Sequence, residues 1–177
     1  MTKILAIPGS LRLNSSSNYI LSAILSVAPK NIECEVYQGI GSLPHFNDAE
    51  ETPGPVVEFR QKIRESDAVL ICTPEYAFGI PGSLKNALDW TVGTGDFVDK
   101  PAGLVTAASQ GEKGHAAMLL VLTAIAAKVI DESTLLIPFV KARLDRNGTV
   151  KDNSLLVQLT TVVQALVKAS SMKYNVL

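Results

Sequence analysis

Short apolar runs alternate along the chain with stretches in which apolar residues recur every three or four positions. The apolar runs predict five strands, at residues 4–7, 32–37, 67–73, 101–108 and 133–139. The periodic stretches predict five helices, at residues 19–28, 55–66, 83–90 and 116–129 and from Asp152 or Asn153 through the apolar stripe that ends at Val167. Strand and helix therefore follow one another five times.

This order predicts an α/β fold in which parallel strands are joined by helical crossovers that cover both faces of a sheet. Residues 67–73 form a continuous apolar run, as strands buried on both faces usually do. No linker or change of composition divides the chain. We therefore expect one doubly wound domain over residues 1–177, with a five-stranded parallel sheet in the order 2-1-3-4-5.

Composition narrows the range of partners. The 177 residues carry a net charge of −1, which gives no electrostatic case for nucleic acid or an anionic membrane. The longest apolar stretch, residues 116–130, is too short to span a bilayer, and the start of the chain runs directly into a strand. We expect a cytoplasmic protein that binds neither nucleic acid nor membrane.

Cysteine and histidine give no sign of a metal site. Cys34 and Cys72 lie in predicted strands, where buried free thiols are expected. His45 and His115 are far apart and share no ligand spacing, and no CxxC motif is present.

The stretch at residues 4–18 is strand, polar loop and helix start in succession. Ser17 or Asn18 is the expected cap of that helix, and a helix N-terminus offers free amides and a partial positive charge to an anion. The loop adds the Ser10 hydroxyl and the Arg12 guanidinium, a set that suits a phosphate monoester. Ordinary capping by a serine-rich loop is the alternative, and the glycine spacings of dinucleotide folds and P-loops are absent.

Ligands of such sheets bind at the carboxyl ends of the strands, beside the switch in strand order. Three loops leave that edge, at residues 9–18, 74–82 and 109–114. The first offers a phosphate seat, the second the flat side chains of Tyr76 and Phe78, and the third free backbone amides. A phosphate, a planar ring and donors to the ring edge together describe flavin mononucleotide (FMN).

Three motifs carry a resemblance to a known family: GSLR at residues 9–12, LPHFND at 43–48 and TPEYAFGIPGSLKNALDW at 73–90. The chain resembles the NAD(P)H-dependent FMN reductases, flavodoxin-like enzymes also described as quinone, azo-dye or chromate reductases. The similarity extends over nearly the whole chain.

The resemblance implies roles for particular positions. The implied cofactor-binding residues are Ser10, Arg12, Ser17 and Asn18 for the phosphate, Pro74, Glu75, Tyr76 and Ala77 for the ring and ribityl chain, and Ser109, Gly111 and Gly114 near the pyrimidine edge. Lys85, Asn86 and Asp89 match motif positions with an expected structural role or a contact to a neighbouring subunit.

Three features depart from the family pattern, and the first is that the serine run places Asn18 one residue later than in many members. Ala77 stands where many members have asparagine, and His115 follows Gly114 where GG is frequent. His115 either approaches the ring or the nicotinamide, or is a surface residue at the start of a helix.

The implied activity is hydride transfer from NADPH or NADH to FMN, followed by reduction of a quinone, azo, metal-oxyanion or free-flavin acceptor. No side chain is required as acid or base, so no catalytic residue is assigned. A flavodoxin-like electron carrier and a flavin-binding regulatory protein are the alternatives, although carriers are usually strongly acidic. The apolar helix at 116–129 and the resemblance together predict a homodimer or a dimer of dimers.

Overall fold

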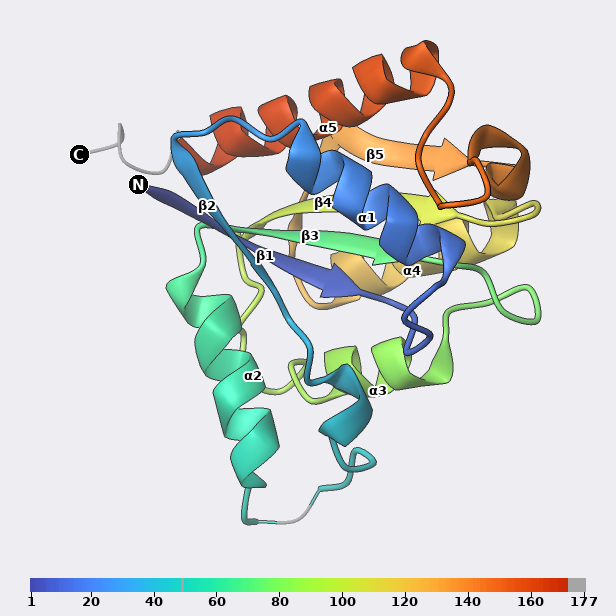
Figure 1. Ribbon diagram of the computed structural model, residues 1–177. Coiled ribbons are helices and arrows are strands. Elements are labelled where there is room, and N and C mark those ends of the chain that lie inside the picture. The colour runs from blue at the N-terminus through green and yellow to red at the C-terminus, as the bar shows by residue number, and fades with distance from the viewer. Residues whose placement is uncertain (49, 172–177) are drawn as a thin grey trace.

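A computed structural model describes residues 1–48 and 50–171 and contains one parallel sheet in the order β2-β1-β3-β4-β5 (Figure 1). The strands are β1 (Thr2–Pro8), β2 (Ile32–Val36), β3 (Ala68–Thr73), β4 (Pro101–Ala107) and β5 (Lys128–Ile137). The predicted fold class and strand order are confirmed. Residues 49 and 172–177, which the one-domain prediction also covers, lie outside the described residues.

In the described residues, five α-helices connect and cover the strands, and α1 and α5 lie on the opposite face of the sheet from α2 and α3 (Figure 1). Their bounds are α1 (Ser16–Ser26), α2 (Gly54–Glu65), α3 (Gly82–Asp89), α4 (Glu112–Ala124) and α5 (Asn153–Ser171), with short 3-10 helices η1 (Ile40–Ser42) and η2 (Val140–Arg143). None of the helices in the described residues is both long and apolar enough to cross a membrane.

Two apolar cores lie on the two faces of the sheet. Strand β1 shows how they are separated, since Leu5 and Ile7 pack with α2, α3 and α4 while Ile4 and Ala6 pack with α1 and α5. Strands β3 and β4 are buried along their whole length because helices cover both of their faces. The central strands are therefore rigid supports for the loops that leave their carboxyl ends.

The helix predicted at residues 116–129 is wrong at both ends. The observed α4 begins four residues earlier, at Glu112, and ends at Ala124, and residues 128 and 129 already belong to β5. The helix ends in a Schellman motif, in which the Ala127 amide donates to the Leu122 carbonyl at 3.0 Å and Ala126 has a φ of 57°. Glycine usually occupies this left-handed position. With alanine there, nothing in the apolar pattern marks the stop.

Three smaller differences concern caps and burial. Ser15, rather than Ser17 or Asn18, caps α1, since its Oγ accepts a hydrogen bond from the Asn18 amide at 3.2 Å. Of the two alternatives for α5, Asp152 is the cap, because its Oδ1 accepts from the Ser154 amide at 2.8 Å. Cys72 is buried as expected, whereas Cys34 is only half-buried because β2 is an edge strand.

Candidate functional site

The loops at the carboxyl ends of the strands surround a cavity of about 250 Å³. Its walls come from four segments that are far apart in sequence and that the strand order brings to one edge (Figure 1). The lining residues are Arg12, Asn14, Ser15, Ser16 and Ser17 before and in α1, Pro74, Glu75 and Tyr76 after β3, Ala107, Ala108 and Ser109 at the end of β4, and Val140 and Lys141 after β5.

The loop between β1 and α1 lies directly against the end of β3. The Gly9 amide donates to the Cys72 carbonyl at 2.8 Å. A Cβ at Gly9 would stand 2.3 Å from the Thr73 Oγ1, closer than any side chain can approach. Glycine is therefore required here, because it lets the first polar loop reach the wall formed by the loop after β3.

Free hydrogen-bond donors gather at the start of α1 and make it a candidate anion site, called the anion seat below. The Ser15 Oγ accepts a hydrogen bond from the Asn18 amide and lies 3.1 Å from the Ser17 Oγ. The amides of Ser16 and Ser17 have no acceptor in the described part of the chain. These amides, the partial positive charge of the helix start and the exposed Arg12 guanidinium form a donor set that suits a phosphate group.

Ser10 and Asn18 do not line the cavity. The Asn18 Nδ2 donates to the carbonyls of Arg12 at 2.9 Å and Leu13 at 3.3 Å, so this side chain holds the polar loop in shape. Its Oδ1 is buried and has no partner in the described residues. The Ser10 Oγ accepts from the Arg12 amide at 3.2 Å and lies 3.4 Å from the Tyr76 hydroxyl. Both residues therefore position the loop that carries Arg12.

The loop after β3 contains a tight two-residue turn. Tyr76 and Gly79 exchange two backbone hydrogen bonds, of 3.0 and 2.9 Å. The two residues between them, Ala77 and Phe78, have φ angles of 49° and 59°. Pro74, Glu75 and Tyr76 line the cavity, whereas Ala77 lies at the tip of the turn and does not.

The first turn of α4, which follows the loop after β4, is bonded to the loop after β3. The Glu75 carboxylate accepts from the Gly114 amide at 2.6 Å. Gly111 is the residue before α4 and has a φ of 102°, a left-handed conformation that favours glycine. Ser109 lines the cavity, but Gly111 and Gly114 do not. The Gly114 amide, expected to be a free donor, is therefore already used by a carboxylate.

His115 lies in the first turn of α4 and is half-buried. Its Nδ1 is 2.9 Å from the Thr106 Oγ1 at the end of β4, and burial lowers the pKa of the imidazole. The ring is consequently neutral near pH 7 and does not line the cavity. Of the two predicted alternatives, the position at the start of a helix is correct, but the side chain is anchored instead of free on the surface.

The KNALDW motif has a structural role in the described residues. The Asn86 side chain donates to the Pro44 carbonyl at 2.9 Å and accepts from the Phe46 amide at 2.7 Å. The buried Trp90 also donates to Pro44, at 2.9 Å, and Lys85 forms an ion pair with Asp89 at 2.5 Å. The motif thus attaches the LPHF segment to α3.

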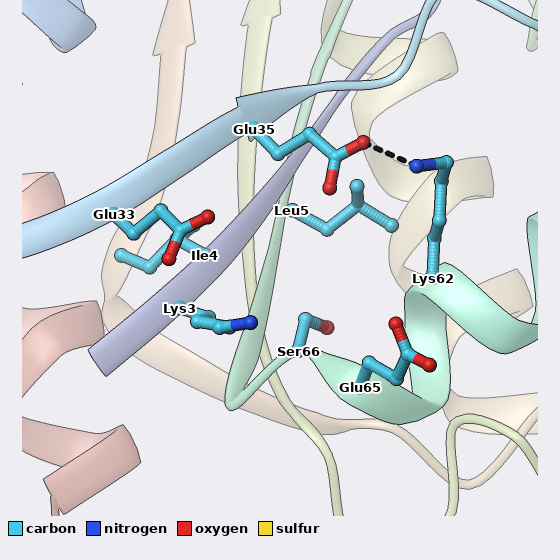
Figure 2. A pocket seen from close by; sticks show the side chains of 8 residues that line it. All are labelled: Lys3, Ile4, Leu5, Glu33, Glu35, Lys62, Glu65 and Ser66. Atoms are coloured by element: carbon cyan, nitrogen blue, oxygen red, sulfur yellow. Dashed lines mark hydrogen bonds and ion pairs between the residues drawn. The ribbon is translucent and has the colours of Figure 1, made fainter. Parts of the chain in front are cut away.

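A second hollow lies near the amino-terminal ends of β1 and β2 and has a different character (Figure 2). Its volume is about 30 Å³, room for about one water molecule. Glu35 and Lys62 form an ion pair of 2.5 Å across it, and this hydrogen bond raises the pKa of Lys62. Its size excludes an organic ligand. Across the described residues, no cluster of histidine, cysteine or acidic side chains could hold a metal ion.

Sequence reasoning missed Asn14, the Ala107–Ala108 pair, Val140 and Lys141 as cavity residues. Asn14 lies between the predicted residues Arg12 and Ser17 and could have been included with them. Val140 and Lys141 follow the last strand in an unremarkable segment, and only the position of β5 beside β4 brings them to this edge. No local signal in the sequence marks them.

Several known proteins are similar to this chain in sequence and in fold. A model of the family described as NADPH-dependent FMN reductase matches residues 2–142. The 2-hydroxy-1,4-benzoquinone reductase of Burkholderia sp is 32% identical over 157 residues, which cover 84% of this chain and 85% of that protein. The quinone reductase of Escherichia coli (strain K12) is 28% identical over 169 residues, 89% of each chain. Among solved structures, FerB, a flavoenzyme NAD(P)H:(acceptor) oxidoreductase from Paracoccus denitrificans, has a TM-score of 0.83 at 25% identity and matches 97% of this chain and 98% of that chain.

Proposed function

The chain belongs to the NADPH-dependent FMN reductase family, and from that premise we propose that it reduces a quinone with electrons taken from NADPH or NADH through FMN bound in the cavity at the carboxyl edge of the sheet. Membership of this family makes the chain an oxidoreductase that works with FMN and a nicotinamide nucleotide. Two relatives are named benzoquinone and quinone reductases, which is why a quinone is preferred over azo, metal-oxyanion and free-flavin acceptors.

One observation carries the placement of FMN. The anion seat at the start of α1 opens into the same cavity as the Pro74–Tyr76 wall. FMN is a phosphate monoester joined through a flexible chain to a planar ring, so it needs both features in one place. The free amides of Ser16 and Ser17 and the Arg12 guanidinium fit the phosphate, and Pro74 and Tyr76 offer apolar surface to the ring.

Bound FMN supplies the hydride-accepting chemistry. The protein residues hold and orient it. Arg12 and the α1 amides fix the phosphate, while Tyr76 and Pro74 hold one side of the ring and exclude water from it. The Glu75 carboxylate keeps the loops after β3 and β4 together through the Gly114 amide. No side chain in this arrangement has to give or take a proton, so no acid or base is assigned.

The remaining predicted site residues have supporting positions in this proposal. Ser17 and Ser109 contact the ligand from the cavity wall, Ser10 and Asn18 hold the phosphate loop, and Ala77, Gly111 and Gly114 shape the two loops beside the ring.

An absorption spectrum tests the function directly. Purified protein is mixed with FMN, passed through a desalting column and treated with NADPH and then NADH in the absence of oxygen. Retained flavin that is bleached within seconds and regains its colour on addition of benzoquinone is the expected result. Retained flavin that stays oxidised would instead identify an electron carrier or a regulatory flavin-binding protein. Absence of any flavin binding, on the column or by direct titration, would contradict the placement of FMN.

The assembly that we propose is a homodimer or a dimer of dimers in the cytoplasm. Helix α4 buries Met118 and Leu122 in the core but leaves Leu120 72% exposed, so its outer side remains apolar. Such a face is commonly covered by a second copy. Sedimentation velocity at micromolar concentration, with a Leu120→Glu variant as comparison, tests this. A wild-type protein that sediments as a monomer would contradict it.

A further inference from the structure

Lys141 is a cavity residue for which neither the motifs nor the proposed function accounts. It is the second residue of η2, the short 3-10 helix that follows β5. Val140, just before it, is buried in the core on the α1 and α5 face. Lys141 itself is exposed and lines the cavity on the segment after β5, in the same cavity that Arg12 lines from the polar loop.

The backbone around Lys141 is held in place by contacts with the end of β4. The Phe139 amide donates to the Ser109 carbonyl at 3.0 Å, and the Val140 amide donates to the Ala108 carbonyl at 3.1 Å. Phe139 has a φ of 50°, a conformation that bulky side chains rarely adopt. Such outliers persist only where the surrounding structure enforces them, and they gather at binding sites. The turn therefore directs the chain after β5 to the cavity.

The cavity wall carries two positively charged side chains and one negatively charged side chain. Arg12 and Lys141 are its cations, and neither forms an ion pair in the described residues, whereas Arg143 two positions later is paired with Asp152. The carboxylate on the wall, Glu75, is bonded to the Gly114 amide. The cavity thus keeps two uncompensated positive charges. A phosphate monoester carries between one and two negative charges near pH 7, so a single arginine would leave part of that charge unpaired.

We propose that Lys141 is the second cation of the phosphate seat and that it makes the site prefer FMN to riboflavin, which has the same ring and no phosphate. This inference rests on the proposed function, because it takes FMN to be the ligand. The 2′-phosphate of NADPH has the same chemistry. We assign Lys141 to the FMN phosphate because it lines the same cavity as Arg12 and the free amides of α1.

The test compares dissociation constants of FMN and riboflavin, measured by quenching of flavin fluorescence, for the wild type and for Lys141→Ala and Lys141→Arg. Lys30→Ala is the control, since Lys30 is equally exposed but precedes β2 at the opposite edge of the sheet. We expect Lys141→Ala to weaken FMN binding by about tenfold, and riboflavin binding by less than about twofold, because a charge-assisted contact is lost. Lys141→Arg and Lys30→Ala should bind both flavins as the wild type does.

Equal weakening of FMN and riboflavin would overturn the inference, since Lys141 would then act on the ring or on the loops. Unchanged FMN binding in Lys141→Ala would overturn it as well. A rise in the KM for NADPH but not NADH, with FMN binding unchanged, would move Lys141 to the nicotinamide nucleotide and also overturn it. A wild-type protein that binds neither flavin is a different result, because it contradicts the proposed function itself. Circular dichroism of each variant verifies the fold.

Discussion

At the scale of single residues, the site depends on backbone conformations that the amino acids present do not favour. Ala77 and Phe78 at the tip of the loop after β3 both have positive φ angles, as the two central residues of a type I′ turn do. Asparagine and glycine are the preferred residues there, and the sequence resemblance had already marked Ala77 as a departure. The turn is formed nonetheless, because the backbones of Tyr76 and Gly79 donate a hydrogen bond to each other in both directions and close it.

Replacing Ala77 by asparagine should therefore stabilise the protein. A left-handed conformation costs an ordinary L residue about 1 kcal/mol, and asparagine tolerates it better, so we expect the free energy of unfolding to rise by up to about 1 kcal/mol. Urea denaturation measures it. Ala77→Val, with a branched side chain at the same position, is the matched control and should destabilise. A destabilised Ala77→Asn variant would contradict this account of the turn.

His115 makes stability depend on pH. Burial lowers the pKa of this imidazole in the folded protein below its ordinary value of 6.5. Well above pH 6.5 the ring is neutral in both states and contributes nothing to the pH dependence. As the pH falls below that value, the unfolded chain takes up a proton that the folded one resists, so stability is lost between the ordinary and the folded pKa.

Removing the imidazole should weaken this dependence. Between about pH 7.5 and pH 5.5, the wild type should lose more stability than His115→Gln, which keeps a polar side chain near Thr106. Denaturation curves at the two pH values measure the difference, and His45→Gln, at an exposed loop residue, should behave as the wild type. An identical loss in the wild type and His115→Gln would show that His115 is not responsible.

At the scale of elements, the start of α1 combines helix capping with the proposed binding of the FMN phosphate. Ser15 satisfies the Asn18 amide and leaves the amides of Ser16 and Ser17 without an acceptor in the described residues. A cap at Ser17 or Asn18 would have moved the helix start by two or three residues and removed those amides from the cavity. The position of the cap therefore determines which backbone groups can bind an anion.

Ser15→Ala should cost about 1 kcal/mol of stability, the usual value for a lost helix cap, and should weaken FMN binding as the helix start frays. Ser16→Ala is the matched control for stability, because the Ser16 hydroxyl has no hydrogen bond in the described residues, and Ser42→Ala, at an exposed serine outside the cavity, is the control for flavin binding. Thermal unfolding and a flavin titration measure the two effects. Equal effects of Ser15→Ala and Ser16→Ala would assign the loss to the loop as a whole.

At the scale of the whole molecule, the cavity exists because the sheet order places β1 and β3 side by side and β4 and β5 next to them. The helices on both faces bury the strands, and the loops at the carboxyl ends surround the cavity. Gly9 is where this arrangement is most sensitive, since the first loop crosses the end of β3 there without room for a side chain.

Gly9→Ala should consequently separate the polar loop from β3. Overpacking of this kind costs about 1–3 kcal/mol, and the anion seat should move away from the Pro74–Tyr76 wall. We expect lower stability together with a loss of FMN affinity much larger than that of riboflavin, since the phosphate contacts move most. Gly54→Ala is the control, because nothing surrounds a Cβ at that position. Unchanged flavin binding in Gly9→Ala would contradict this view of the loop.

The alternation of strands and helices could be predicted from the sequence, since hydrophobic periodicity reports which residues face a core. The strand order and the edge at which the loops meet followed from the usual topology of such an alternation. The sequence also placed Arg12, Glu75 and Tyr76 in loops of that edge. Only the folded structure shows that α4 ends at Ala124, because the left-handed Ala126 closes the helix, and that Glu75 occupies the Gly114 amide. It alone brought Lys141 to the cavity. Those outcomes depend on which distant loops touch, and a local pattern of residues carries no information about that.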